Sequence, residues 1–258
     1  MKILQAIAYL NPKFGGDVNV CTHLSRMLAK KNHDVTIITT DLNLDSSYAD
    51  NLRSEGITVI PFPCIAHLGL FLYTPSINAW LETNLKEYDI IHIHNFRSYQ
   101  NNQIHSYAVK FRIPYILQAH GSVIPFSEKQ NLKKLYDIVW GKKILRDATQ
   151  VIALTGTESA QYQRMGVPQN KIVIIPNGID LKSFENLPEY GKFRRSHGIQ
   201  NDCKVILFVG RLHKTKGLDL LIDAFSEIIK DNIDACLIII GPDDGYLGQL
   251  TGKIKKVS

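Results

Sequence analysis

The feature that most constrains the fold of this chain is the regular alternation of short apolar runs with helix-like patterns. The runs end at polar, glycine or proline residues, as expected for strands that are buried on both faces of a sheet. Strands that alternate with helices predict a parallel α/β sheet. The predicted strands cover residues 2–8, 35–39, 58–60, 90–94, 115–118, 151–153 and 172–175, with helical patterns at Val20, Leu24, Met27 and Leu28 and at Leu132, Leu135, Ile138 and Val139.

The alternation is interrupted by a polar segment rich in Lys and Arg, at residues 181–202. We interpret this segment as a linker between a first domain, residues 1–180, and the start of a second domain, residues 203–258. The second domain shows a strand at 204–209, a helix with one apolar face, and a strand at 235–240. Because only a short basic tail follows, we expect a second domain that is truncated. The apolar face comprises Leu218, Leu221, Ile222, Phe225, Ile228 and Ile229.

Composition narrows the class of protein but does not choose a function. Apolar residues make up 45% of the chain and charged residues 21%, as in soluble globular proteins. A net charge of +6 suits anionic partners such as nucleotide diphosphates. No apolar run reaches the roughly 18 residues of a membrane span. The cysteines lack zinc or disulfide spacing and are interpreted as reduced thiols of a cytosolic protein: Cys21, Cys64, Cys203 and Cys236.

The segment GRLHKTKG, residues 210–217, is the most informative motif. Its strand ends at Gly210 and places Arg211 at the carboxyl edge of a parallel sheet, where ligands of open α/β folds bind. Lys216 comes just before the next helix, whose N-terminus favours anions. The two cations suit a diphosphate, although basic loop residues are often simply solvated.

Three further features belong to the first domain. Gly15 and Gly16 form a turn between the first strand and its helix, and glycine lets a backbone approach a ligand closely. His120 follows a strand and would lie at its carboxyl end, able to hydrogen-bond a sugar hydroxyl or to pack in a loop. His92 and His94 share one face of their strand, but no third ligand has a recognisable spacing, so no metal site is expected.

Taken in order, these pieces resemble the retaining glycosyltransferases of family four. The resemblance implies a GT-B fold, in which two Rossmann-like domains face each other across a cleft, the second of them partial here. It extends over nearly the whole chain. The residues that carry it are Gly15-Gly16, DIIHIH at 89–94, His120-Gly121, DATQVIALT at 147–155, IPNGID at 175–180 with Phe184, GRL at 210–212 with Lys216-Gly217, and IIGPD ending at Asp243.

The resemblance implies transfer of a sugar from a nucleotide sugar to a glycan, lipid-linked or small-molecule acceptor, with retention. Arg211 and Lys216 match the residues that grip the donor diphosphate, and His120 matches the catalytic histidine that contacts the donor sugar. Gly15 and Gly16 match the loop that faces donor phosphate and acceptor. The family generally needs no obligatory metal or other cofactor, and the departing phosphate helps to deprotonate the acceptor.

The chain departs from the family pattern because no Glu follows Glu227, so the later E-x7-E carboxylate pair is absent. We therefore expect this chain to bind donor poorly and to be inactive. Two alternatives are a nucleotide-sugar epimerase of the same fold and a non-catalytic module that binds an acceptor or partner. A dinucleotide-dependent oxidoreductase fits less well, since no G-x-G-x-x-G fingerprint occurs.

The expected location is the cytoplasm, with peripheral contact at the inner face of the membrane as one possibility. No nucleic-acid partner is expected. The apolar stretch HLGLFLY, residues 67–73, is a candidate for contact with a lipid acceptor, although packing in the core or in an acceptor-side loop is the favoured interpretation.

Overall fold

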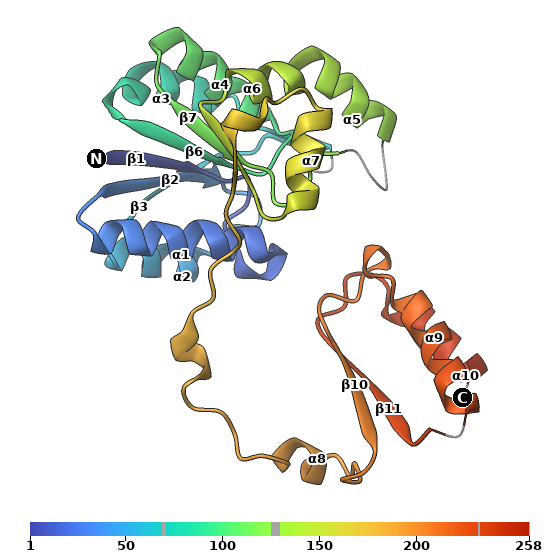
Figure 1. Ribbon diagram of the computed structural model, residues 1–258. Coiled ribbons are helices and arrows are strands. Elements are labelled where there is room, and N and C mark those ends of the chain that lie inside the picture. The colour runs from blue at the N-terminus through green and yellow to red at the C-terminus, as the bar shows by residue number, and fades with distance from the viewer. Residues whose placement is uncertain (69–70, 125–129, 232, 258) are drawn as a thin grey trace. The chain divides into compact units, whose positions relative to one another are not determined.

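A computed structural model describes residues 1–68, 71–124, 130–231 and 233–257 of the chain (Figure 1). The chain divides into two compact units, Met1–Ile179 and Asp180–Ser258. We refer to them as the N-terminal unit and the C-terminal unit. Each unit has its own sheet and its own hydrophobic cluster.

Among the described residues, the N-terminal unit is built on one sheet of seven strands in the order β3-β2-β1-β6-β7-β8-β9. Every neighbouring pair is parallel, which confirms the predicted α/β class. Leu4 of β1, for example, pairs with Thr36 on one side and Ile91 on the other. The strands are β1 (Lys2–Ala6), β2 (Asp34–Thr40), β3 (Thr58–Phe62), β6 (Ile90–His94), β7 (Tyr115–Gln118), β8 (Gln150–Ala153) and β9 (Ile172–Ile174).

Helices cover both faces of this sheet, with α1 and α2 on one face and α3, α4 and α6 on the other (Figure 1). Alternate residues of β2 show the two faces, because Ile37 packs in the cluster with α1 and Ile38 in the cluster with α4. Burial on both faces explains why the strands are continuously apolar. The helices are α1 (Gly16–Lys30), α2 (Ser46–Ser54), α3 (Ser76–Asn84), α4 (Tyr99–Phe111), α5 (Gln130–Tyr136), α6 (Lys142–Asp147) and α7 (Gly156–Arg164).

The helical pattern around Leu132 is confirmed as a helix, but its apolar residues are not the ones that are buried. Helix α5 continues into a π-helical turn, Asp137–Gly141, and the buried side chains there are Tyr136 and Asp137. Leu132, Leu135, Ile138 and Val139 are all exposed. Apolar spacing identifies the helix, while the face that packs depends on a buried ion pair of Asp137 described below.

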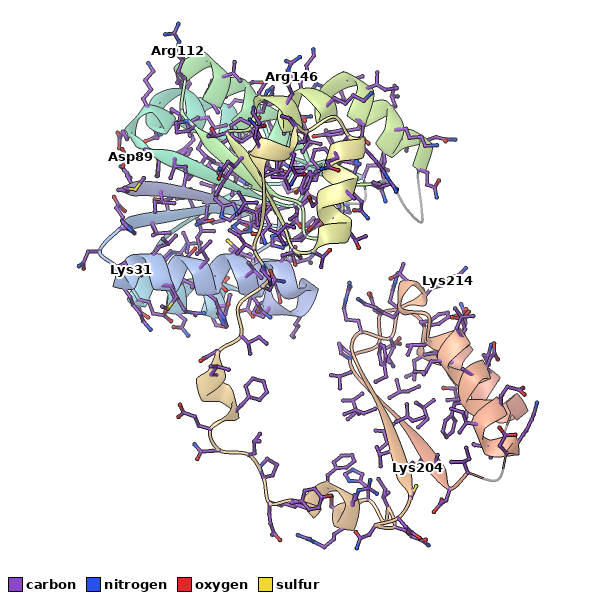
Figure 2. All side chains as sticks on the ribbon, viewed as in Figure 1. Lys31, Asp89, Arg112, Arg146, Lys204 and Lys214 are labelled. Atoms are coloured by element: carbon purple, nitrogen blue, oxygen red, sulfur yellow. The ribbon has the colours of Figure 1, made fainter. Side chains whose placement is uncertain are left out.

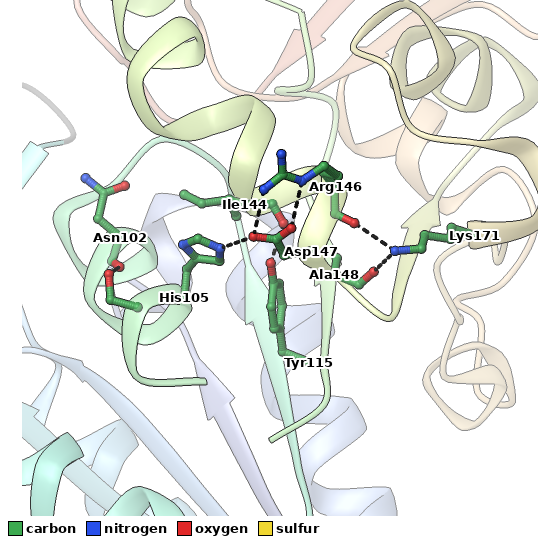
Figure 3. Close-up of polar contacts among 9 residues, drawn as sticks. Asn102, His105, Tyr115, Ile144, Arg146, Asp147, Ala148 and Lys171 are labelled. Atoms are coloured by element: carbon green, nitrogen blue, oxygen red, sulfur yellow. Dashed lines mark hydrogen bonds and ion pairs between the residues drawn. The ribbon is translucent and has the colours of Figure 1, made fainter. Parts of the chain in front are cut away.

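A polar network at the amino ends of the strands fixes α4, α6 and β7 to one another (Figure 3). The Asp147 carboxylate lies 2.9 Å from both His105 Nε2 and Arg146 Nε. The buried Tyr115 hydroxyl donates to the carbonyl of Ile144. Lys171 donates to the carbonyls of Arg146 and Ala148, at 2.7 and 2.9 Å. These bonds satisfy carbonyl groups at the end of α6 and hold β7, the strand that leads to His120.

The apolar stretch 67–73 is divided between exposed and buried positions. Strand β4 (Ala66–Leu68) pairs antiparallel with β5 (Phe71–Tyr73), and Gly69 and Leu70 lie outside the described residues. Leu72 is fully buried, whereas Leu68 is 68% exposed. The stretch thus contributes one anchor to the core. None of the helices in the described ranges has the length and apolar character needed to cross a membrane.

The C-terminal unit contains two parallel strands, β10 (Lys204–Val209) and β11 (Ala235–Ile240), joined through helix α9 (Leu218–Lys230). Lys204 begins β10, and Lys214 lies in the loop beyond its other end (Figure 2). The segment before β10 includes the short helix α8 (Lys192–Ser196). Leu218 and Ile222 of the predicted apolar face are buried, but Ile229 is 47% exposed.

The residues after β11 were expected to be a short basic tail, and that expectation is wrong. They form helix α10 (Leu247–Val257), which packs on α9. Tyr246 and Leu250, four residues apart, are buried in the same cluster as Leu218. Asp243 Oδ1 accepts from the backbone N–H groups of Tyr246 and Leu247, both at 3.0 Å, and so caps the helix. This aspartate and the i, i+4 apolar pair are the signals that predict a helix start.

Candidate functional site

The strand order of the N-terminal unit reverses at β1. Strands β2 and β3 extend from one side of β1, while β6 to β9 extend from the other. In open α/β sheets, ligands bind outside the carboxyl ends of the strands at such a switch point. The loops that follow β1, β6 and β7 therefore form the candidate site of this unit.

Gly15 and Gly16 lie in the loop after β1, where α1 begins at Gly16. A Cβ atom on Gly15 would come 2.7 Å from Asp17 Oδ1, so a larger residue would displace that carboxylate. Asp17 Oδ2 in turn accepts a hydrogen bond from Asn95 Nδ2 at 2.8 Å. Asp17 and Asn95 thus join the loop after β1 to the loop after β6, and neither was singled out in the sequence.

His120 follows β7 and has a positive φ of 52°, with Gly121 at 82°. This left-handed pair turns the chain sharply at the strand end. His120 Nε2 lies 3.0 Å from His94 Nδ1. Burial lowers the pKa of His120 to about 4, although the nearby Asp17 carboxylate acts in the opposite direction. At neutral pH His120 is therefore an uncharged hydrogen-bonding group. It lies at the carboxyl edge of the N-terminal sheet, as does the loop that contains Gly15.

A buried glutamate holds the His120 loop in place. Glu158, in the first turn of α7, is 4% exposed and accepts from the N–H of Gly121 and the N–H of Leu154, both at 2.7 Å. It connects the loops after β7 and β8. The sequence signal was available, since Thr155 and Glu158 have the T-x-x-E spacing of a capping box and Thr155 Oγ1 does cap the Glu158 N–H.

Replacing Glu158 by Gln is expected to destabilise the N-terminal unit by about 2 kcal/mol, because one buried N–H then faces an amide that cannot accept its hydrogen bond. Denaturant unfolding followed by tryptophan fluorescence measures this unit alone, since Trp80 and Trp140 both belong to it. Glu82→Gln is the control, because Glu82 forms an exposed pair with Lys110. Equal effects of the two substitutions would contradict the anchoring role of Glu158.

A buried ion pair also holds the same loop. Arg97 and Asp137 lie 2.8 Å apart, with side chains 8% and 6% exposed. Arg97 also donates to the carbonyls of Ser122 and Val123, two and three residues beyond His120. Gly141 permits this packing, because a Cβ there would come 2.7 Å from Asp137 Oδ1. The partners are 40 residues apart, so no local pattern predicted the pair.

His92 and His94 do share a face of β6, with ring centroids 4.0 Å apart. Both nitrogens of His94 have side-chain neighbours, His120 at 3.0 Å and Gln5 Oε1 at 2.8 Å. Burial lowers the pKa of His92 to about 3 and that of His94 well below its usual range. Within the described ranges no three His, Cys, Asp or Glu side chains group as metal ligands.

In the C-terminal unit, Arg211 and Lys216 lie in the loop between β10 and α9. Arg211 Nη1 is 2.7 Å from Asp244 Oδ2, and about two fifths of each side chain is exposed. Lys216 is exposed and ends the turn Lys214–Lys216, directly before Gly217 and α9. The two cations thus belong to the carboxyl edge of the small sheet, at a helix N-terminus.

The backbone that carries Arg211 is tightly packed against the loop after β11. A Cβ on Gly241 would come 1.8 Å from the carbonyl oxygen of Gly210, so glycine is required at 241. Leu212 N donates to the Pro242 carbonyl at 2.9 Å, and Asp244 N donates to the Leu212 carbonyl at 3.1 Å. This ladder extends the strand pairing and brings Arg211 beside Asp244.

Comparison with known proteins connects this architecture to one class. Residues 14–183 match the family model described as Glycosyltransferase Family 4, and residues 189–257 match that described as Glycosyl transferases group 1. An uncharacterized glycosyltransferase of Methanocaldococcus jannaschii is 28% identical, over 97% of this chain and 66% of its own length. D-inositol 3-phosphate glycosyltransferase of Kineococcus radiotolerans is 23% identical, over 84% of this chain and 53% of its own.

Among solved structures, HepE of Anabaena in complex with UDP-glucose aligns with a TM-score of 0.70 at 21% identity, over 100% of this chain and 66% of HepE. The fold is that of the GT-B glycosyltransferases. The chain belongs to glycosyltransferase family 4. It spans about two thirds of the length of the Methanocaldococcus protein and of HepE.

Proposed function

We propose that this chain acts in a glycosyltransferase that moves a sugar, with retention, from a nucleotide-sugar donor to a glycan, lipid-linked or small-molecule acceptor. The observation that carries the proposal is the match of two glycosyltransferase family models, one to each unit of the chain. HepE, which shares the fold, was crystallised with UDP-glucose, and this supports a nucleotide sugar as the donor.

The site residues divide between the two ends of such a donor. Arg211 and Lys216 hold the diphosphate, since a guanidinium fork and an ammonium beside a helix N-terminus stabilise its charge. His120 is neutral and contacts the sugar. The Gly15–Gly16 loop gives backbone access to the donor phosphate and the acceptor.

The chemistry proposed for these groups needs no metal or other cofactor. The departing diphosphate takes up the proton of the acceptor hydroxyl as the new glycosidic bond forms on the same face of the sugar. Arg211 and Lys216 stabilise the charge that develops on the leaving group. Orientation of donor and acceptor supplies much of the remaining rate enhancement.

The experiment compares this chain with a chimera that is continued by the part of the Methanocaldococcus relative beyond the match. Both are incubated with UDP- and GDP-sugars and a panel of acceptors. The chimera is expected to release nucleotide and enlarge an acceptor. The 258-residue chain is expected to bind donor weakly and not turn over, because it has no Glu after Glu227. Transfer by the chain alone would contradict its inactivity.

Product analysis separates the alternatives. An isomerised sugar with no enlarged acceptor would identify an epimerase. Acceptor binding without any calorimetric response to UDP or GDP would identify a binding module. For a lipid-linked acceptor we propose peripheral contact at the inner face of the membrane, in the cytoplasm, and sedimentation with liposomes at low salt tests this contact.

A further inference from the structure

Three polar side chains form a line beneath the carboxyl edge of the N-terminal sheet. They come from three neighbouring elements: Gln5 from β1, His94 from β6 and His120 from the loop after β7. Gln5 Oε1 lies 2.8 Å from His94 Nε2, and His94 Nδ1 lies 3.0 Å from His120 Nε2. Gln5 and His94 are each 1% exposed, so water does not compete for these bonds.

The direction of the hydrogen bonds along this line follows from the atom at its buried end. Burial lowers the pKa of both histidines, to about 4 for His120, so each ring is neutral at pH 7 and carries a single N–H. Gln5 Oε1 can only accept, and His94 Nε2 therefore carries the proton. His94 Nδ1 is then an acceptor, and His120 Nε2 must donate to it. His120 Nδ1 is left as a lone-pair acceptor.

We infer that Gln5, acting through His94, fixes His120 as a hydrogen-bond acceptor at Nδ1, and that this atom takes a hydrogen bond from a hydroxyl group of the donor sugar. The second half of the inference rests on the function proposed above. Gln5 and His94 are positioning residues, since they act through His120. A phosphate oxygen is itself an acceptor, so this tautomer directs His120 to the sugar and leaves the diphosphate to Arg211 and Lys216.

Asp17 is the charged group that also acts on the His120 ring. Its carboxylate lies near enough to His120 to act on the pKa of the ring, and a carboxylate favours an N–H that faces it. Asp17 Oδ2 accepts from Asn95 Nδ2 at 2.8 Å. The Gln5–His94 line favours a proton on His120 Nε2, whereas a carboxylate that faced Nδ1 would favour a proton there, and this makes the inference directly measurable.

The test is the long-range ¹⁵N–¹H correlation spectrum of the histidine rings in this chain at pH 7, with His120 assigned by its loss in His120→Asn. We expect the proton on Nε2 and none on Nδ1. A proton on Nδ1 would overturn the inference. This measurement needs no ligand, so it is independent of whether the protein transfers sugars.

Gln5→Met then tests the role of Gln5, because Met has a similar length but offers no strong acceptor. The expected result is a mixture of both His120 tautomers. Thr36→Val is the matched control, since it removes a different buried bond, 3.0 Å to the Tyr88 hydroxyl, and leaves the imidazoles untouched. If folded Gln5→Met kept the single, unchanged tautomer of His120, the inference that Gln5 acts through His94 would be overturned.

Titration with UDP and UDP-glucose tests the sugar contact. We expect UDP-glucose, but not UDP, to shift the His120 Nδ1 resonance, while both ligands shift the amides of residues 210–217. A shift of Nδ1 by UDP alone, or amide shifts with UDP-glucose while Nδ1 stays unchanged, would overturn the sugar contact. Unchanged amides at 210–217 with either ligand would overturn the proposed donor site and with it the sugar contact. The tautomer result is unaffected in either case.

Discussion

Replacing both Arg211 and Lys216 by Ala is expected to weaken UDP binding by about 10²- to 10⁴-fold. Hydrogen bonds to charged groups contribute roughly 1.5–3 kcal/mol each, and 1.4 kcal/mol corresponds to about tenfold in affinity. Both cations lie in the loop before α9, where the helix N-terminus adds its own attraction for an anion. The effect is measured as the dissociation constant of UDP in the chimera described above, from amide shifts of residues 210–217.

Lys214→Ala is the control for the charge of the loop, because Lys214 is an exposed lysine of the same loop (Figure 2). It removes one positive charge, whereas the double variant removes two. Arg211→Lys keeps the charge but loses the planar fork, so an intermediate loss is expected. Since Arg211 also pairs with Asp244, folding of each variant is checked by circular dichroism. If Lys214→Ala produced half of the double variant's weakening on a logarithmic scale, the loop would attract UDP by its overall charge, and the assignment would be wrong.

Mild acid is expected to unfold the N-terminal unit, with a slope of about 4 kcal/mol per pH unit near pH 5. His92, His94 and His120 are neutral in the folded unit because burial lowers their pKa values, to about 3 for His92 and about 4 for His120. In the unfolded chain they titrate near 6.5, so unfolding at pH 5 takes up about three protons. Each proton contributes about 1.36 kcal/mol per pH unit.

The sign is fixed by the direction of these shifts. Well above pH 6.5, the three rings are unprotonated in both the folded and the unfolded state, so their burial does not make stability depend on pH. As the pH falls from 6.5 toward about 4, the unfolded state binds protons that the folded state cannot, and stability is lost. At about 4 kcal/mol per pH unit, the stability lost over one to two pH units is comparable with the total stability of a typical domain, about 5–15 kcal/mol.

Denaturant unfolding at a series of pH values, followed by tryptophan fluorescence, checks this result. His92→Leu removes one of the three rings and should lower the slope to about two thirds. The centroid of the His92 ring lies 4.0 Å from that of His94. His23→Asn replaces an exposed histidine of α1 and is expected to leave the slope unchanged. A wild-type slope near zero around pH 5 would contradict neutral burial of the three rings.

Much of the fold could be predicted from local sequence because its signals are local. Strands 90–94, 115–118, 204–209 and 235–240 are confirmed residue for residue, since apolar runs between breakers define them. The first strand ends at Ala6 rather than Ala8. The missed helix α10 had its signals too, in Asp243 and the Tyr246–Leu250 pair, but a short basic ending obscured them.

The positions of His120, Arg211 and Lys216 at strand ends could be predicted in the same way, and their roles remain proposals. What sequence could not supply are the partners of these residues. Gln5 and His94 are 89 residues apart, and Arg97 and Asp137 are 40 apart. No pattern within one helix or strand encodes such pairs.

By itself, the sequence determined a parallel α/β architecture, the edges at which chemistry-bearing residues emerge, and membership of a sugar-transferring family. Tertiary structure alone decided which imidazole nitrogens lie beside one another, and that Glu158 and Arg97 hold the same loop. The physical reason is the sequence separation between the interacting residues. Strand and helix patterns depend on neighbours within a few residues, whereas the protonation and direction of a buried hydrogen bond depend on strands that meet only when the sheet forms.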